Sequence, residues 1–244
     1  MEVFKKIGQV SKGAVVALSA AAVLALAPAA KADLISNGSF ESSTNGAGQL
    51  GYNTTATGWT TSGATTSYTF LFSPSTATGV GSAGIYGNVQ LPSGVTASPD
   101  GGNFVGQDGV AQLSPLSQTV NGLVVGNLYV LDFYWGGTEQ THNADEPTSE
   151  GWQVSLGSQT QSTSILSVPT LGFSGWQQAS MAFTATSSSE VLSFLAEGSP
   201  TGAPPFSLLD GVSLNPAPEP ATYTMMLGGL LAGAGLWRRK KQAK

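Results

Sequence analysis

The chain has 244 residues, a formal net charge of −5 and no cysteine. All nine of its Lys and Arg residues lie in the first 31 or the last seven positions, whereas twelve of its 14 Asp and Glu residues lie between residues 33 and 217. A central region without Lys or Arg excludes nucleic-acid binding, which depends on cations that displace counterions from phosphates. It also disfavours nucleotide phosphates and anionic lipids but leaves neutral sugars and divalent cations as ligands. Without disulfides, its stability must come from a hydrophobic core.

The first 32 residues have the three parts of a secretory signal peptide. Three lysines in the first 12 residues precede an uncharged apolar segment, residues 13–27. Ala30, Lys31 and Ala32 then form the small-x-small pattern that signal peptidase reads. The sequence therefore predicts export, with Asp33 as the first residue of the mature protein.

From residue 34 onward, short β-type runs alternate with Gly, Asn, Ser and Pro, and no stretch has a long helical periodicity. Turn signals at roughly ten-residue spacing predict an all-β antiparallel sandwich or barrel of about ten strands. The expected strand regions are 34–35 with 40, 58–60, 68–72, 84–91, 103–106, 116–120, 128–135, 152–156, 159–168, 176–186, 191–196 and 206–214. Turn pairs in residues 121–127 predict a hairpin between the runs 116–120 and 128–135.

Alternation along the strands predicts which side chains face the core. Tyr129, Leu131, Phe133 and Trp135 share one face, which we expect to be buried. Trp59 and Trp152 also fit core positions. Residues 136–151 are expected to form a polar loop with the densest acidic patch of the domain, which contains His142, Asp145, Glu146 and Glu150.

Two short motifs at the ends of the region 34–215 resemble those of a known group of domains. The opening segment 37–41 (Asn-Gly-Ser-Phe-Glu), followed by Gly58-Trp59, and the closing segment 208–214 (Leu-Leu-Asp-Gly-Val-Ser-Leu) resemble those of the galactose-binding-like domains. This group includes many carbohydrate-binding modules. The resemblance implies an antiparallel jelly-roll β-sandwich for residues 33–215.

Asp210 is the sharpest candidate for a metal ligand. In the run 206–214 strict alternation points it to the apolar side, where a carboxylate needs a partner. In the modules that the chain resembles, an acidic residue of the closing strand and the Glu of the opening Phe-Glu pair hold a structural Ca²⁺, which implies Asp210 and Glu41 here. Two alternatives remain open: a bulge at residues 208–209 that turns Asp210 outward, or a carboxylate capped by backbone N–H groups. No other cofactor is expected.

A sugar site is predicted where aromatic rings fall on polar strand faces. Alternation places Tyr134 and Trp176 there, and an exposed ring offers a flat surface on which a sugar can stack. Asp132 and Gln178 are near in sequence and can bond hydroxyl groups. The alternative is that loops bury both rings.

The sequence lacks most of the residues that common catalytic mechanisms need. The chain has one His, no Cys and no Gly-x-Ser-x-Gly elbow, and its central region has no Lys, so triad, thiol and Schiff-base mechanisms are not supported. A glycosidase needs only two carboxylates, but nothing in the sequence selects a pair. We therefore expect a protein that is not an enzyme.

The C-terminal segment, residues 216–244, has three parts in a fixed order. Pro218, Glu219 and Pro220 end the preceding fold. Residues 221–237 are uncharged and span about 25 Å as a helix, marginally enough to cross a membrane. Four cationic residues follow and predict the orientation of this helix in the membrane: they stay in the cytoplasm, and the chain before the helix lies on the other side. They are Arg238, Arg239, Lys240 and Lys241.

This order resembles the PEP-CTERM sorting signal of exported bacterial proteins. The resemblance implies recognition of Pro218, Glu219 and Pro220, and cleavage by an exosortase-type membrane protease, in bacteria that typically build an exopolysaccharide matrix. The expected route runs through signal peptidase and a transient stay in the inner membrane to the cell surface or extracellular matrix. The leading hypothesis is a non-catalytic surface or matrix protein that binds a glycan; the alternatives are a carbohydrate-binding module proper and a polysaccharide-acting glycosidase or lyase.

Overall fold

The computed structural model describes residues 33–63, 65–111 and 113–218. The predicted signal peptide with its cleavage residues Ala30 and Ala32, the residues Glu219 and Pro220, and the apolar segment 221–237 with its four cations lie outside the described residues. Within the described part, no helix is long and apolar enough to cross a membrane. The chain from Ala32 to Ala217 forms one compact unit.

The described residues form a mostly β structure with a single short helical turn. Its elements are β1 (Gly48–Gln49), β2 (Thr69–Phe72), the π-helical turn η1 (Thr76–Val80), β3 (Ser82–Gly84), β4 (Gly87–Val89), β5 (Phe104–Asp108), β6 (Leu116–Asn121), β7 (Leu128–Glu139), β8 (Thr148–Leu156), β9 (Gln159–Ser162), β10 (Leu166–Val168), β11 (Gln177–Thr184), β12 (Ser189–Ser199) and β13 (Pro205–Pro216).

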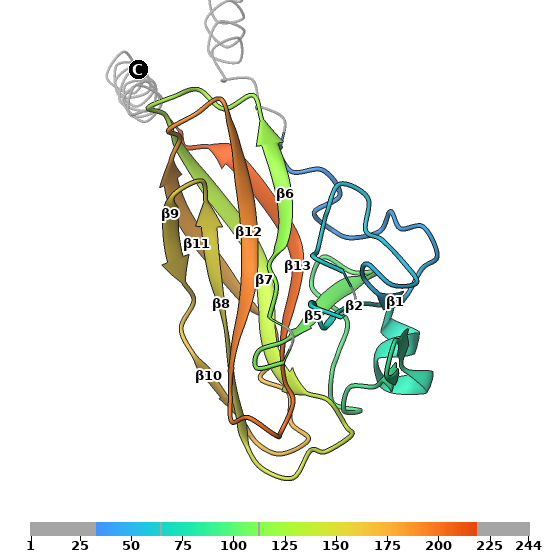
Figure 1. The fold of residues 1–244 in the computed structure, drawn as a ribbon. Helices are drawn as coiled ribbons and strands as arrows, with labels where there is room; N and C mark the ends of the chain where they lie inside the picture. Colours follow the sequence, from blue (N-terminus) through green and yellow to red (C-terminus); the bar gives the residue numbers. More distant parts are fainter. Residues whose placement is uncertain (1–32, 64, 112, 219–244) are drawn as a thin grey trace, which may run out of the picture. The chain divides into compact units, whose positions relative to one another are not determined.

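Two antiparallel sheets pack face to face (Figure 1). One has six strands in the order β1-β2-β5-β13-β7-β11, and the other has the order β10-β8-β12-β6, with β9 paired to β8. From β5 to β8 and again from β11 to β13, each successive strand lies in the opposite sheet. This repeated crossing is the connectivity of a jelly roll. The fold is therefore an antiparallel jelly-roll β-sandwich, as predicted.

The predicted hairpin between β6 and β7 is wrong. β6 pairs with β12 in one sheet, and β7 pairs with β11 and β13 in the other. The turn signals between them are real, since Gly122 and Gly126 both have positive φ. They reverse the chain from one sheet to the other and do not join neighbours within a sheet.

The main core lies between the two sheets and follows the predicted alternation. Tyr129, Leu131, Phe133 and Trp135 of β7 are all at most 3% exposed and belong to this core. Aromatic rings from both sheets meet at Phe194 of β12. Its partners are Trp59, Phe133 and Trp152.

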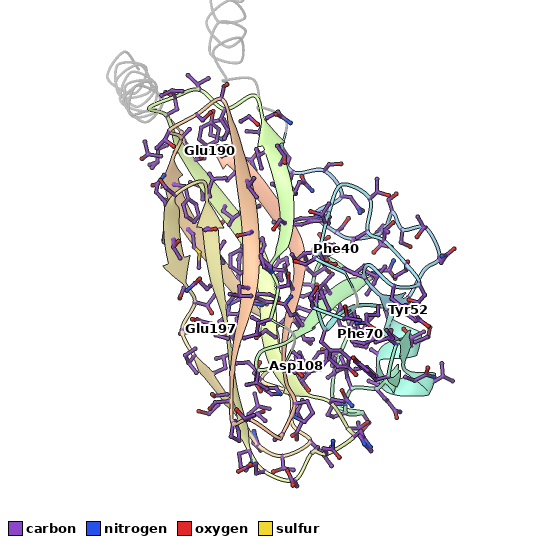
Figure 2. All side chains as sticks on the ribbon, viewed as in Figure 1. Phe40, Tyr52, Phe70, Asp108, Glu190 and Glu197 are labelled. Carbon is purple, nitrogen blue, oxygen red and sulfur yellow. The ribbon has the colours of Figure 1, made fainter. Side chains whose placement is uncertain are left out.

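A second apolar cluster covers the outer face of the six-stranded sheet near β2 and β5. It joins alternate residues of β2, β5 and β13 to Ala77 of η1 and to the segment 89–95. Phe70, labelled in Figure 2, belongs to it, whereas its neighbour Leu71 faces the main core. β2 is thus buried on both faces, which explains its continuous apolar run.

Five strand predictions need correction. Residues 34–40 form no strand, and the run 84–91 holds only the end of β3 and the three residues of β4. β7 extends to Glu139 and β8 begins at Thr148, so the expected loop 136–151 shrinks to residues 140–147. The run 159–168 is two strands, β9 and β10, because residues 163–165 interrupt it. Residues 58–60 contribute only an isolated bridge, from Thr60 to Ser117.

Candidate cation and ligand sites

Five carboxylates are buried in a domain that has no lysine or arginine. Burying a charge costs several kcal/mol unless a partner compensates it, so each needs backbone N–H groups, a proton or a cation. Their exposed fractions run from 0% to 6%. They are Asp108, Glu139, Glu150, Glu190 and Asp210.

Two of the five accept hydrogen bonds from the loop beside them, although burial still raises the pKa of Asp108. Asp108 Oδ1 accepts the N–H groups of Val110 and Ala111 at 2.8 and 2.9 Å. Glu190 Oε1 accepts the N–H groups of Thr186 and Ser187 at 2.8 and 3.0 Å. Burial alone would raise the pKa of Glu190, but these bonds and that of the Thr186 hydroxyl lower it below the ordinary value. Both are local turn caps, and Figure 2 shows them far apart in the fold.

Asp210 has no such compensation. It lies in the fully buried stretch 205–210 of β13, and neither carboxylate oxygen has a hydrogen-bond partner. Burial, together with the nearby carboxylates of Asp100 and Glu41, raises the pKa of Asp210 to about 7. Ser98 and the Gly211 N–H lie close enough to lower this pKa, although neither forms a hydrogen bond with good geometry.

The structure brings Glu41 and Asp210 near each other, together with the turn 98–103. Glu41 Oε1 accepts the Asn103 N–H at 2.5 Å. A Cβ on Gly102, whose φ is +65°, would lie only 1.8 Å from that same oxygen, so this close approach requires glycine. The turn therefore packs against Glu41, and its Asp100 side chain lies beside Gly211, the residue after Asp210.

The structure differs from the expectation that Asp210 shares one face with Val212 and Leu214: those two belong to the main core, whereas Phe206 and Leu208 belong to the second apolar cluster on the outer face. The irregularity in β13 lies between Asp210 and Ser213, after the carboxylate, where Gly211 has φ +57°. No backbone N–H caps the carboxylate with hydrogen-bond geometry. Among the described residues, no three or more Asp, Glu, His or Cys side chains converge to hold a metal, so Ca²⁺ here would need carbonyl and water oxygens as well.

The predicted sugar residues lie on the outer face of the six-stranded sheet. Tyr134 of β7 pairs directly with Gln178 of β11 and with Asp210 of β13. Asp132 lies one step along the same face, opposite Ser180. Paired residues of neighbouring strands point to the same side, so these side chains form a row across three strands.

Trp176 lies next to this row but packs as part of the second apolar cluster. Its ring contacts Phe104 and Phe173 edge-on, at centroid distances of 5.5 and 6.0 Å. Its Nε1 donates a hydrogen bond to the Thr96 carbonyl at 3.1 Å. The ring is half-buried, so it offers less free surface for stacking than the alternation suggested.

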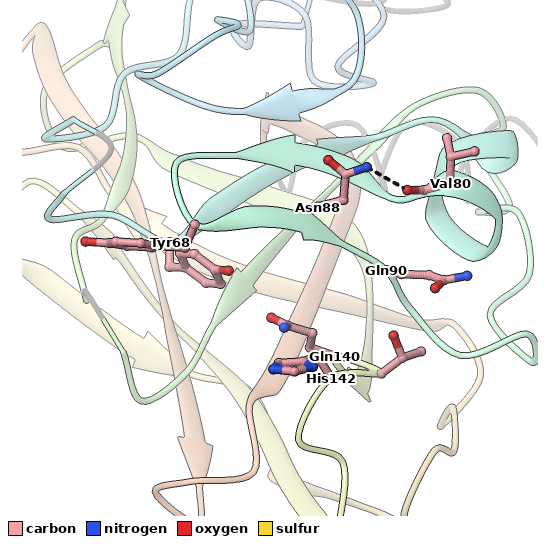
Figure 3. A pocket seen from close by; sticks show the side chains of 8 residues that line it. Tyr68, Val80, Asn88, Gln90, Gln140 and His142 are labelled. Atoms are coloured by element: carbon pink, nitrogen blue, oxygen red, sulfur yellow. Dashed lines mark hydrogen bonds between the residues drawn. The ribbon is translucent and has the colours of Figure 1, made fainter.

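The structure reveals an open pocket of about 440 Å³ that sequence reasoning missed (Figure 3). Its walls come from three separated segments: the residue before β2, the stretch from Val80 at the end of η1 to Gln90 just after β4, and the start of the β7–β8 loop. The lining residues are Tyr68, Val80, Tyr86, Asn88, Gln90, Gln140, Thr141 and His142. A backbone bond from Thr141 N–H to the Gln90 carbonyl, 2.9 Å, joins two of these segments.

The pocket has the chemistry of a neutral, hydroxyl-rich ligand. Tyr86 is 66% exposed, and its ring lies 6.4 Å from that of Tyr68, so aromatic surface faces the opening. Three amide side chains, a hydroxyl and an imidazole line it, and no carboxylate does. Gln90 offers its side-chain oxygen, because its Nε2 donates to the Thr78 and Gly79 carbonyls at 3.1 and 2.7 Å. Asn88 is held in place by donating to the Val80 carbonyl at 3.0 Å, the dashed line in Figure 3. No short motif could have indicated this site, because its residues are up to 74 positions apart.

Fold and sequence together define an exported jelly-roll protein. Residues 216–240 match the family model of the PEP-CTERM protein-sorting motif. The chain therefore carries a sorting signal of proteins that are exported and processed at the membrane. Comparison with curated protein sequences gives no match.

Solved structures with a similar outline include carbohydrate-binding domains and an enzyme. A cyclase from Fischerella sp. TAU has 15% identity and a TM-score of 0.47, over 77% of this chain and 98% of that one. The CBM22-1 xylan-binding domain of Paenibacillus barcinonensis Xyn10C has 14% identity and a TM-score of 0.40, over 79% and 99%. A CBM4 structure has 16% identity and a TM-score of 0.34, over 75% and 99%.

Proposed function

We propose that this protein is a non-catalytic component of the cell surface or extracellular matrix and that it binds a neutral glycan in the pocket between Tyr68 and His142. The observation that carries the proposal is the lining of this pocket. It combines an exposed tyrosine ring with amide, hydroxyl and imidazole groups. Sugar rings stack on aromatic faces while such uncharged groups bond their hydroxyls.

The charge of the domain selects among glycans. Between residues 33 and 217 there are twelve carboxylic acids and no Lys or Arg. An acidic polysaccharide would meet like charge without any guanidinium or ammonium to pair with it. A neutral exopolysaccharide is therefore the preferred ligand class.

The sorting motif supports the proposed location. A signal peptide cut by signal peptidase would deliver the domain across the inner membrane, and the C-terminal segment would hold it there until an exosortase-type protease acts. Release at the outer side would leave a domain whose stability does not depend on disulfides.

The absence of a recognisable catalytic group supports a binding role over turnover. The single His lines an open pocket that has no carboxylate, so neither an acid–base pair nor a triad can be assembled there. The alternative, a glycosidase or lyase, predicts turnover of a polysaccharide that disappears when one carboxylate pair is mutated.

A glycan array followed by titration calorimetry tests the proposal. Tyr86→Ala should weaken binding of the selected glycan about 5- to 150-fold, because stacking of a ring on one aromatic side chain is worth about 1–3 kcal/mol. Tyr52→Ala is the matched control, since Tyr52 is 55% exposed and does not line the pocket. Equal loss in both variants, or loss only in Trp176→Ala, would reject this pocket; the latter would favour the face of Asp132, Tyr134 and Gln178.

We also propose a structural Ca²⁺ at Asp210 and Glu41. What supports it is a buried carboxylate without hydrogen bonds, two further carboxylates nearby and no cationic side chain in the domain. Ca²⁺ should raise the melting temperature of the protein, and Asp210→Ala should lose part of that rise. An identical Ca²⁺-dependent shift in this variant and in the wild type would contradict the assignment.

A further inference from the structure

The inward faces of the two sheets end in carboxylates at one end of the sandwich. In β7 the buried row Leu131, Phe133, Trp135 reaches Glu139 four residues later. In β8 the row Leu156, Val154, Trp152 ends in Glu150 and Thr148. A Cβ on Gly137 would lie 2.7 Å from Glu150 Oε2, so the inward face of β7 contacts the Glu150 carboxylate directly. This end lies at the bottom of Figure 1, where the β7–β8 loop is found.

Four buried oxygen atoms at this place have no hydrogen-bond partner. They are Glu139 Oε2, both carboxylate oxygens of Glu150 and Thr148 Oγ1. The three side chains are 0%, 0% and 3% exposed. Only Glu139 Oε1 is satisfied, by the Leu171 N–H. Asp108 and Glu190, equally deprived of cationic neighbours, each accept backbone N–H groups at one oxygen; Glu190 Oε2 is also unpartnered, but neither place gathers four such atoms.

We propose that Glu139, Thr148 and Glu150 form a second Ca²⁺ site, which links the two sheets at this end of the sandwich. The donor set consists of oxygen only, which suits a hard divalent cation and not Zn²⁺ or copper. Ca²⁺ takes six to eight oxygens in flexible geometry, so two carboxylates and a hydroxyl would be completed by backbone carbonyls and water. The site is separate from that at Asp210, which lies on the outer face of the six-stranded sheet.

A shared proton is the simplest competitor. One proton between the two carboxylates would pair two of the four oxygens, and the Thr148 hydroxyl, which lies close enough to Glu150 to lower its pKa, would pair with the remaining Glu150 oxygen. A cation can be bound by all four. It also neutralises two negative charges in a region, residues 33–217, that contains no Lys or Arg to do so. The Ca²⁺ count below separates the two explanations.

The test is a count of bound Ca²⁺ in the full-length chain, purified in mild detergent, treated with chelator and then titrated by equilibrium dialysis. Wild type should bind one more Ca²⁺ than Glu150→Gln, and the same difference should persist when both carry Asp210→Asn. The expected Kd is in the 10⁻⁴–10⁻³ M range of extracellular modules. Glu146→Gln is the matched control, because Glu146 is exposed in the adjacent loop; it should bind as much Ca²⁺ as the wild type.

Thr148→Val keeps the proposal testable if Glu150→Gln fails to fold. It keeps both carboxylates and removes one ligand, so Ca²⁺ should still bind at this site but at least tenfold more weakly. Equal stoichiometry and affinity in wild type, Glu150→Gln and Thr148→Val would overturn the proposal. So would a wild-type protein that binds no Ca²⁺ beyond the Asp210-dependent ion and instead releases one proton from this pair on titration.

Discussion

Asp210→Asn should flatten the pH dependence of stability in the calcium-free protein. Asparagine has the shape of the protonated acid but cannot ionise. The folded protein raises the pKa of Asp210 from 3.8 to about 7, mainly through burial. The folded state therefore holds a proton that the unfolded chain has released, and the free energy of unfolding falls as pH rises between these two values.

The size of the effect follows from the two pKa values. Each unit of pKa difference corresponds to about 1.4 kcal/mol, so the full effect of Asp210 is about 4 kcal/mol. Between pH 5 and pH 8, proton linkage gives a loss of about 2.5 kcal/mol from this residue alone. Glu150, whose pKa burial raises from 4.5 to about 8, adds a similar or larger loss over the same interval.

Urea unfolding, monitored by tryptophan fluorescence in EDTA at pH 5 and pH 8, measures these losses in the free energy of unfolding. The wild type should lose about 2.5 kcal/mol more than Asp210→Asn across this interval. Added Ca²⁺ should remove most of the difference, because it binds the ionised carboxylate and favours the folded state at high pH. If the free energy of unfolding changes equally in wild type and Asp210→Asn between pH 5 and pH 8 in EDTA, the Asp210 carboxylate is solvated or capped in solution. The argument from burial would then be wrong.

Two other predictions test the core and the sorting segment. Phe194→Ala should lower the free energy of unfolding by about 3–5 kcal/mol, because it removes the ring that contacts Trp59, Phe133 and Trp152. Val191→Ala, in the same strand but 49% exposed, should lower it by less than about 1 kcal/mol. Equal losses in the two variants would contradict the assignment of Phe194 to the core face of β12. Deleting residues 218–244 should leave the urea midpoint of the domain unchanged and abolish its delivery to the cell surface in fractionated cells; unchanged delivery would show that the sorting motif is not used.

Alternation alone predicted the strands that border the main core. In β7 apolar residues recur at every second position, so the facing of Phe133 could be inferred without knowing any neighbour. In β13 the irregularity after Asp210 changes the face, so Val212 and Leu214 face the main core while Phe206 and Leu208 belong to the outer cluster; the burial of Asp210 was predicted, but not the face on which it lies. What alternation cannot say is which sheet a strand joins. The turn residues between β6 and β7 allow a chain reversal either within one sheet or between two sheets. The hairpin prediction assumed the first, whereas β6 and β7 lie in different sheets.

The polar end of the core was missed because its residues have the composition of a loop. Gly136, Gly137 and Thr138 precede Glu139 with no apolar side chain, although all four are buried strand residues. They are buried by contacts from β8, β10 and the segment 169–174, which local sequence does not reveal. The pocket was missed for the same reason, since its walls meet only in the folded chain.

These two overlooked features are joined through one strand end. Glu139 is the last residue of β7, and the next three residues, Gln140 to His142, line the pocket. An ion held between Glu139 and Glu150 would fix the position from which this wall begins, while the Thr141–Gln90 backbone bond fixes its far side. In a domain without Lys or Arg, backbone N–H groups and divalent cations are the means left to stabilise buried carboxylates in their ionised form, and Glu150 accepts no backbone N–H group. The proposed ions and the proposed glycan pocket therefore belong to one arrangement, in which occupancy at the end of the core should order the residues that contact the ligand.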